Sequence, residues 1–252
     1  MAGTGQGIPV SGSGSGYTRA ELKQYMRFLL SEFDPTKLAD EHLLKFDLNQ
    51  LALLAYTRVA RELRAFRASY TLTATPSQAI YALASFSAGA GARLFEIRHA
   101  AFDSKELDLT TEHVLDATES DWRFKAAATP RKFLPWGAGK FRLYPAPAAA
   151  ATIYVEGFET PDPAMFDNDA DYPQIHADDQ PLIAIYMAMV VAVGAPNEHA
   201  MKATPLWNMW TEGLTTAQAS INSGGGRIVQ GRAATAGTIL WPTASDNIVR
   251  AN

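Results

Sequence analysis

The chain has 252 residues, of which 47% are hydrophobic and 19% are charged, a balance typical of a globular protein with about two modules and not of a disordered chain. Its net charge of −4 and its pI near 5.7 disfavour binding of nucleic acid by the whole surface, because that would need an excess of Lys and Arg. The absence of cysteine excludes disulfide bonds and thiolate zinc sites.

Two helices are expected in the first part of the chain. Residues 1–16 are rich in Gly and Ser, lack the features of a signal peptide and predict a flexible tail. Thr18 and Glu21 then have the spacing of a capping box, and the helix that they begin is expected to end near Pro35. A second helix with a broad apolar stripe is predicted from about Asp40 to about Phe66.

The last turns of the second helix carry a row of arginines, namely Arg58, Arg61, Arg64 and Arg67. Such a row is typical of favourable charge at a helix C-terminus combined with a solvated face. The alternative is a basic ridge that meets an acidic neighbour or the DNA backbone. We therefore treat these arginines as candidate subunit-interface residues.

Short strands follow, because from residue 69 to residue 173 the apolar residues recur with a period of about two. The expected strands are residues 70–74, 80–83, 94–97, 107–109, 142–144 and 153–158. Strands of this length and spacing favour a small antiparallel β-sandwich or barrel. Pro145 and Pro147 lack the N–H that a sheet needs, so we expect a hairpin that turns there between two edge strands. Trp122, Phe133 and Trp136 predict an aromatic loop packed on this sheet.

An acidic stretch and an uncharged stretch come next. Residues 156–179 contain eight Asp and Glu and no Lys or Arg, whereas residues 180–197 contain no charge. This order predicts a solvated loop followed by a buried helix from about residue 181 to residue 193, capped by Asp178 or Asp179. The apolar run 182–195 is shorter than the roughly 20 residues that span a bilayer, so no membrane contact is expected.

A further helix and an extended arm complete the expected elements. Asn197 is expected to cap a helix that Pro205 kinks or restarts, and Trp207 and Trp210 in its segment 206–221 are interpreted as core or subunit-interface anchors. Residues 223–252 show no sustained period and predict an arm that becomes ordered only against a neighbouring chain. The partner-binding residues expected on the arm are Arg227, Ile228, Val229, Arg232, Ile239, Leu240 and Trp241.

Motifs of catalysis and ligand binding give little signal. Asp167, Asp169, Asp171 and Asp178 imitate the spacing of a calcium loop, but Tyr172 stands where glycine is required, so a solvated acidic loop is favoured over a metal site. The sequence has no H-E-x-x-H pair, no G-x-S-x-G turn and no phosphate-binding glycine loop with Lys. We therefore expect no catalytic residue, no cofactor and no metal.

The fold class expected from these elements is α+β. Residues 17–68 and 178–222 are predicted to form a helical bundle, and residues 69–177 a small antiparallel β-sandwich or barrel domain inserted into it. The tail 1–16 and the arm 223–252 extend from this body.

The order of these elements, with the motifs Arg142-Leu-Tyr-Pro-Ala-Pro147 and Tyr154-Val-Glu-Gly-Phe-Glu-Thr-Pro161, resembles the head-to-tail adaptor (connector) proteins of tailed bacteriophages over about residues 17 to 220. The resemblance implies a structural, non-enzymatic protein of the virion neck that is assembled in the host cytoplasm. It also implies a homo-oligomeric ring, commonly of about twelve copies, that binds the portal protein and a tail or nozzle protein. DNA would pass through this ring during genome ejection without specific binding.

Two other functions follow from the residues alone. The first is that of a monomeric protein whose β-sandwich binds a ligand or glycan with the loop of Trp122 and Trp136. A hydrolase is the least favoured, because the sequence shows no nucleophile and base pair. A ring seen by imaging of the purified chain with its portal partner would separate the adaptor from both.

Overall fold

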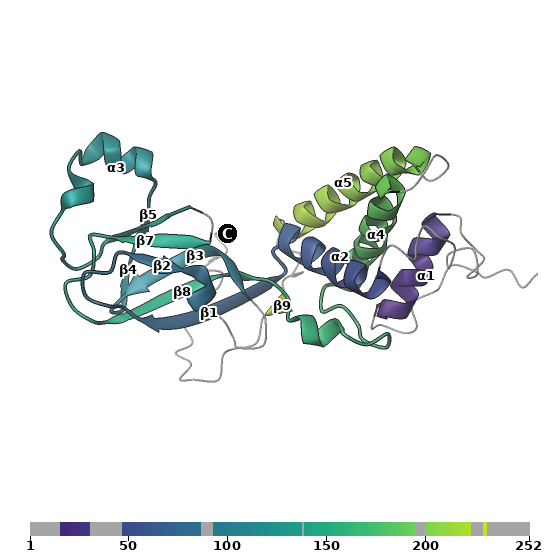
Figure 1. Cartoon of the computed structure of the whole chain (residues 1–252), viewed down its shortest axis with the longest axis horizontal. Coiled ribbons are helices and arrows are strands. Elements are labelled where there is room, and N and C mark those ends of the chain that lie inside the picture. Colours follow the sequence, from purple (N-terminus) through teal and green to yellow (C-terminus); the bar gives the residue numbers. More distant parts are fainter. Residues whose placement is uncertain are drawn as a thin grey trace, which may run out of the picture.

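The computed structural model describes residues 16–30, 47–86, 93–137, 139–194, 200–222 and 229–230. In this part of the chain the protein is mixed α/β, with five α-helices and two β-sheets. The helices are α1 (Arg19–Leu29), α2 (Leu48–Glu62), α3 (Glu112–Thr118), α4 (Pro181–Gly194) and α5 (Ala200–Asn222). Figure 1 shows an elongated molecule in which α1, α2, α4 and α5 lie at one end, and the sheets with α3 lie at the other.

The helical end has one hydrophobic cluster, although its helices come from both ends of the sequence. α4 lies at its centre and contacts α1, α2 and α5. Residues Ile183, Met187 and Ala188 of α4 are fully buried, as expected for a helix that is apolar on every side. Residues 177–194 are apolar and long enough to cross a membrane, but 61% of this stretch is buried within the protein, as in the core helix of a globular domain.

The caps of the first two helices follow from their sequences. The capping box of Thr18 and Glu21 is present, which confirms the predicted start of α1. Asp47 caps α2 by accepting hydrogen bonds from the backbone N–H groups of residues 49 and 50. The predicted end of α2 near Phe66 is wrong, because Arg64 has a left-handed φ of 51° and β1 already begins at Phe66. The expected helix end near Pro35 and the expected start near Asp40 lie outside the described residues.

The strands are β1 (Phe66–Thr73), β2 (Ile80–Ala82), β3 (Leu94–Phe102), β4 (Lys105–Glu106), β5 (Asp108–Leu109), β6 (Lys132–Pro135), β7 (Lys140–Tyr144), β8 (Thr152–Glu159) and β9 (Val229–Gln230). One sheet has the order β4-β3-β8-β1-β9 and the other the order β2-β7-β6-β5. The expectation of purely antiparallel pairing needs correction, because β1 pairs parallel with β9, and β5 pairs parallel with β6. Both sheets are therefore mixed.

The hairpin expected around Pro145 and Pro147 does not form. β7 pairs with β2 and β6 in the smaller sheet, whereas β8 lies between β3 and β1 in the larger sheet. The proline segment therefore carries the chain from one sheet to the other. Prolines end the pairing of β7 because they lack the N–H donor, but this local effect does not determine which strand β8 will pair with.

Side chains from both sheets form a second hydrophobic cluster. Tyr70 and Val155 contribute from the larger sheet, and Phe133 and Leu143 from the smaller one. Phe133 thus lies on strand β6 and not in the aromatic loop that was predicted for it. The short helix α3 was not predicted at all.

The acidic stretch is only partly the solvated loop expected from its charge. Glu156 and Glu159 lie on β8, and Glu159 and Asp179 are buried. The Tyr70 hydroxyl donates a hydrogen bond to Glu159. Burial raises the pKa of Glu159 above its ordinary value, although the hydrogen bond from Tyr70 acts in the opposite direction.

Two expectations concern the last part of the chain. α5 runs without interruption through Pro205, where a kink or a new start was expected, and Asn197 lies outside the described residues. Val229 and Gln230 of the expected arm form β9 beside residues 66 and 67 of the same chain. The other residues named for the arm lie outside the described part of the structure.

Candidate functional site

Two of the four arginines of the row lie on α2, one lies in the turn that follows it, and one lies on β1. This is where the helical end joins the larger sheet. Arg58 pairs with Glu62 within α2, at 2.7 Å between Nη2 and Oε1. The Arg61 guanidinium lies 5.0 Å from the centre of the Phe95 ring on β3.

The remaining two arginines also contact the sheet. Arg64 Nε lies 3.0 Å from Glu96 Oε2 on β3, and Arg67 Nη2 lies 3.6 Å from Glu156 Oε1 on β8. These side chains are partly exposed, so each ion pair contributes at most about 1 kcal/mol to stability. The contacts involve the acidic and aromatic groups of the chain itself, while a role in subunit contacts stays a prediction.

The two tryptophans of α5 differ in exposure. Trp210 is buried beside Tyr186, with ring centres 5.4 Å apart, and belongs to the helical core. Trp207 is 51% exposed and lies next to Val193 at the end of α4, which is 70% exposed. Together with Met189, Ala203 and Thr204, they line a hollow of about 310 Å³.

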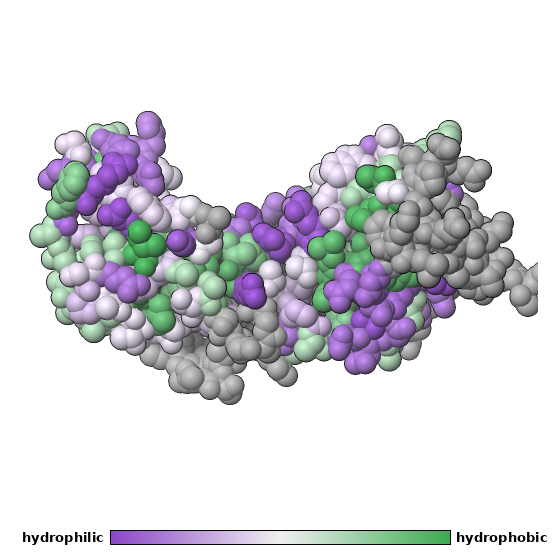
Figure 2. All heavy atoms as spheres, in the orientation of Figure 1, coloured by the Kyte–Doolittle hydropathy of each residue, from purple (hydrophilic) through white to green (hydrophobic). Residues whose placement is uncertain are grey.

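Hydrophobic residues at the helical end are visible in the surface view of Figure 2. Apolar side chains exposed at neighbouring positions are typical of surfaces that contact other proteins. We therefore treat the hollow between α4 and α5 as a candidate interaction surface.

At the opposite end, aromatic and charged side chains form a cluster between α3 and the smaller sheet. Trp122 is 1% exposed and donates a hydrogen bond from Nε1 to Asp116 Oδ1 at 2.8 Å. Its ring meets the rings of Trp136 and Tyr144 edge to face. A buried ring enclosed in this way has little surface left for stacking on a sugar.

Arg142 on β7 packs against two indole rings of this cluster. Its guanidinium carbon lies 4.5 Å from the centre of the Trp122 ring and 4.8 Å from that of Trp136. Burial, followed by the charge of Arg123, lowers the pKa of Arg142 from its ordinary value. Beside it is a hollow of about 310 Å³ whose lining includes Ser77, Arg123 and Lys125.

Glu119 is the carboxylate that holds this cluster together. The Tyr144 hydroxyl donates to it, and Lys125 and Lys132 form ion pairs with it at 2.9 and 3.2 Å. These hydrogen bonds lower the pKa of Glu119 to about 2. The carboxylate is therefore ionised at neutral pH, and the two lysines share its negative charge.

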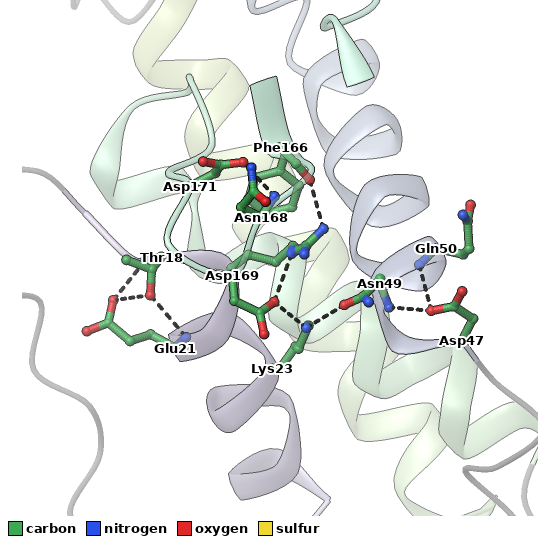
Figure 3. Close-up of polar contacts among 11 residues, drawn as sticks. Thr18, Glu21, Lys23, Asp47, Asn49, Gln50, Phe166, Asn168, Asp169 and Asp171 are labelled. Carbon is green, nitrogen blue, oxygen red and sulfur yellow. Dashed lines mark hydrogen bonds and ion pairs between the residues drawn. The ribbon is translucent and has the colours of Figure 1, made fainter. Parts of the chain in front are cut away.

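The acidic segment is fixed to the start of α1, as shown in Figure 3. Asp169 Oδ1 accepts from Arg19 Nε at 3.0 Å and from Lys23 Nζ at 2.5 Å. Arg19 Nη1 also donates to the carbonyl of Phe166 at 3.1 Å. These contacts hold residues 166–169 in place, while the side chain of Asp167 remains exposed to solvent.

Within the described residues, no group of three or more His, Asp or Glu side chains is arranged to hold a metal ion. The features found there are instead an apolar hollow, a basic pocket and an acidic segment, on separate parts of an elongated molecule.

The comparison with protein-family models shows which family the chain belongs to. The model of the SU10 adaptor protein family matches residues 17–238, which is most of the chain, and the chain belongs to this family. It is therefore a structural adaptor protein of the bacteriophage virion neck, which confirms the resemblance seen in its sequence. No curated protein matches the chain.

Sequence reasoning missed two residues that organise these surfaces, Arg142 and Gln180. Arg142 lies between the buried Phe141 and Leu143, so the alternation of the strand could have placed it on the opposite face, next to the aromatic loop. Gln180 gave no sequence signal, because its amide joins the nearby carbonyls of Pro173 and Ile175 to the distant N–H of Tyr17, a contact that only the fold brings about.

Proposed function

We propose that the chain forms a ring below the portal, which joins the capsid to the tail and continues the DNA channel. The observation that carries this proposal is the match to the adaptor family over residues 17–238. The elongated shape, with an apolar hollow at the helical end and a basic pocket near α3, fits a subunit that must contact neighbours on several sides. The net charge of −4 fits a channel wall that does not retain the phosphates of passing DNA.

We further propose that the ring subunit consists of two modules, with residues 69–177 inserted between the helical segments 17–68 and 178–222. The hydrophobic cluster shared by α1, α2, α4 and α5 supports this division, since each large apolar side chain that it buries stabilises the fold by about 1.5 to 3 kcal/mol. The separate cluster between the two sheets supports an inserted domain with its own core, while the end of the inserted segment, with Phe166 and Ile175, packs in the helical cluster.

The test is assembly with the portal protein of the same phage. The purified chain is mixed with portal rings, and the complexes are examined by negative-stain electron microscopy and native mass spectrometry. We expect an added ring on one face of the portal, with a fixed number of subunits. A chain that stays monomeric, or that binds without forming a ring, would refute the proposed function.

A further inference from the structure

Arg142 is a cation inside a preformed pocket, without a carboxylate partner among the described residues. Its guanidinium packs against the rings of Trp122 and Trp136, which lie nearly perpendicular to each other, and its buried Nε has no hydrogen-bond acceptor in the same part of the chain. Its cationic neighbours do have such partners, since Arg123 pairs with Asp116, and Lys125 with Glu119. A partly buried cation without a counter-ion is unfavourable, and a bound anion would remove this cost.

The surroundings of the pocket favour a single carboxylate as the anion. Because the guanidinium packs against two indole rings, the side chain is held in position, and N–H groups that the rings do not cover can meet a planar carboxylate edge to edge. Glu112, Asp116 and Glu119 lie around the same cluster and balance the charges of Arg123, Lys125 and Lys132. The pocket thus has about one uncompensated charge, which matches one carboxylate better than the closely spaced phosphates of DNA.

The acidic segment at the other end of the molecule has the complementary chemistry. Asp167 is exposed and forms no ion pair or side-chain hydrogen bond with the described residues. The contacts of Arg19 and Lys23 with Asp169 hold the surrounding segment in place, so little order has to be gained on binding. In Figure 1 this segment lies near α1 and α2, at the end of the molecule opposite to α3.

We propose that Arg142 of one subunit binds the carboxylate of Asp167 in a second copy of this chain. The contact joins two different surfaces, and repeated contacts of this type close into a ring when the rotation between copies allows it. The proposal rests on the ring proposed above and identifies one of its subunit interfaces.

The absence of cysteine from the chain allows a direct test by cross-linking. Ala127→Cys places a thiol at the rim of the Arg142 pocket, and Asn168→Cys places one beside Asp167, both at exposed positions. The full chains carrying these substitutions are treated with a short bismaleimide, alone, mixed and on portal rings. We expect a cross-linked dimer from the mixture, none from either variant alone, and a ladder of multimers from the double variant.

Substitutions of Arg142 and Asp167 then test the residues themselves in the double-cysteine chain. Arg142→Gln and Asp167→Asn should each reduce the yield of cross-links at least ten-fold, because a charge-assisted pair is lost. Arg142→Lys should have an intermediate yield, because it keeps the charge but not the planar fork. Arg131→Gln, at an exposed arginine of the same module outside the pocket, is the matched control and should change nothing. Circular dichroism melting shows that each variant is folded.

Three results would overturn the proposal. The first is an unchanged cross-link yield for folded Arg142→Gln, and the second is the absence of cross-links while the wild-type chain forms rings on the portal. In both cases the proposed function stands, whereas absence of rings for the wild-type chain refutes that function as well. The third is a loss of duplex DNA binding by Arg142→Gln with cross-linking unchanged, which would assign the pocket to phosphate.

Discussion

The substitution Gln180→Glu is expected to destabilise the helical end of the protein, and more strongly as the pH rises. Gln180 is 2% exposed, and its amide oxygen accepts a hydrogen bond from the Tyr17 N–H at 2.5 Å. Its amide nitrogen donates to the carbonyls of Pro173 and Ile175, at 3.1 and 3.3 Å. The amide also fills the space above Gly16, where a Cβ would lie 2.1 Å from the amide oxygen.

The size of the effect follows from what a carboxyl group can do in this place. In its protonated form the introduced carboxyl keeps one donor for the two carbonyls, so one hydrogen bond is lost at a cost of about 1 to 3 kcal/mol. In its ionised form it has no donor and faces both carbonyl oxygens, and burial of this kind raises the pKa of a carboxyl group by up to about 3 to 5 units. For each pH unit between the ordinary pKa of about 4.3 and pH 7, the free energy of unfolding of the variant falls by about 1.4 kcal/mol. The total loss at pH 7 is close to 4 kcal/mol.

The sign of this dependence is fixed by the raised pKa in the folded state. The variant is least affected below the pKa of an unfolded Glu, and it loses stability as the pH rises toward the raised pKa of the folded state. The assay is urea unfolding followed by far-ultraviolet circular dichroism at pH 4 and pH 7, for the variant and the wild type. Gln174→Glu, the same chemical change at an exposed position, is the control. Equal losses for Gln180→Glu at both pH values, or a loss no larger than in the control, would refute the reasoning.

Three further predictions concern the sheet, the arm and DNA. Glu159→Gln should raise the midpoint of thermal unfolding at pH 8 but not at pH 4. The wild-type carboxyl has a pKa raised by burial and becomes charged only at the higher pH. An equal effect at both pH values would contradict this. Deletion of residues 223–252 should leave thermal unfolding of the isolated chain nearly unchanged, because in the described structure only a two-residue strand of this segment pairs with β1. The same deletion should abolish ring formation on the portal, and normal rings would exclude a role of the arm. The free chain should show no binding to duplex DNA in a gel-shift assay at physiological salt, whereas sub-micromolar binding that weakens steeply with salt would make the arginine row a nucleic-acid site.

Those parts of the fold that depend on local chemistry could be predicted from the sequence. The capping box of Thr18 fixed the start of α1, and the uninterrupted apolar run after Pro181 predicted a buried α4. Both signals act within a few residues, through capping hydrogen bonds and burial of one segment. The end of α2 was misplaced because the left-handed turn at Arg64 has no glycine or asparagine to mark it.

The arrangement of strands and the basic pocket could not be predicted in this way. Pro145 and Pro147 end the pairing of β7, but they are equally compatible with a hairpin and with a crossing to the other sheet. The residues of the basic pocket are close in sequence, because β6 and β7 form a local hairpin that carries Arg142, and Trp122 is held nearby by its hydrogen bond to Asp116 of α3. The sequence pattern did not predict α3, so it could not place Trp122 against Arg142.

The proposed contact between subunits makes ring closure depend on the angle between the two ends of one molecule. Arg142 lies in the β module and Asp167 beside the helical cluster, so a rotation of one end against the other changes the rotation between neighbouring copies. Arg61 of α2 and Arg64 in the turn after it act at this joint, since Arg61 packs on Phe95, and Arg64 pairs with Glu96. Each such contact contributes little to stability because it is exposed, yet together they restrict the angle. In the proposed ring, this restriction would limit the rotation between neighbouring copies, while a role of the arginines in subunit contacts stays a prediction.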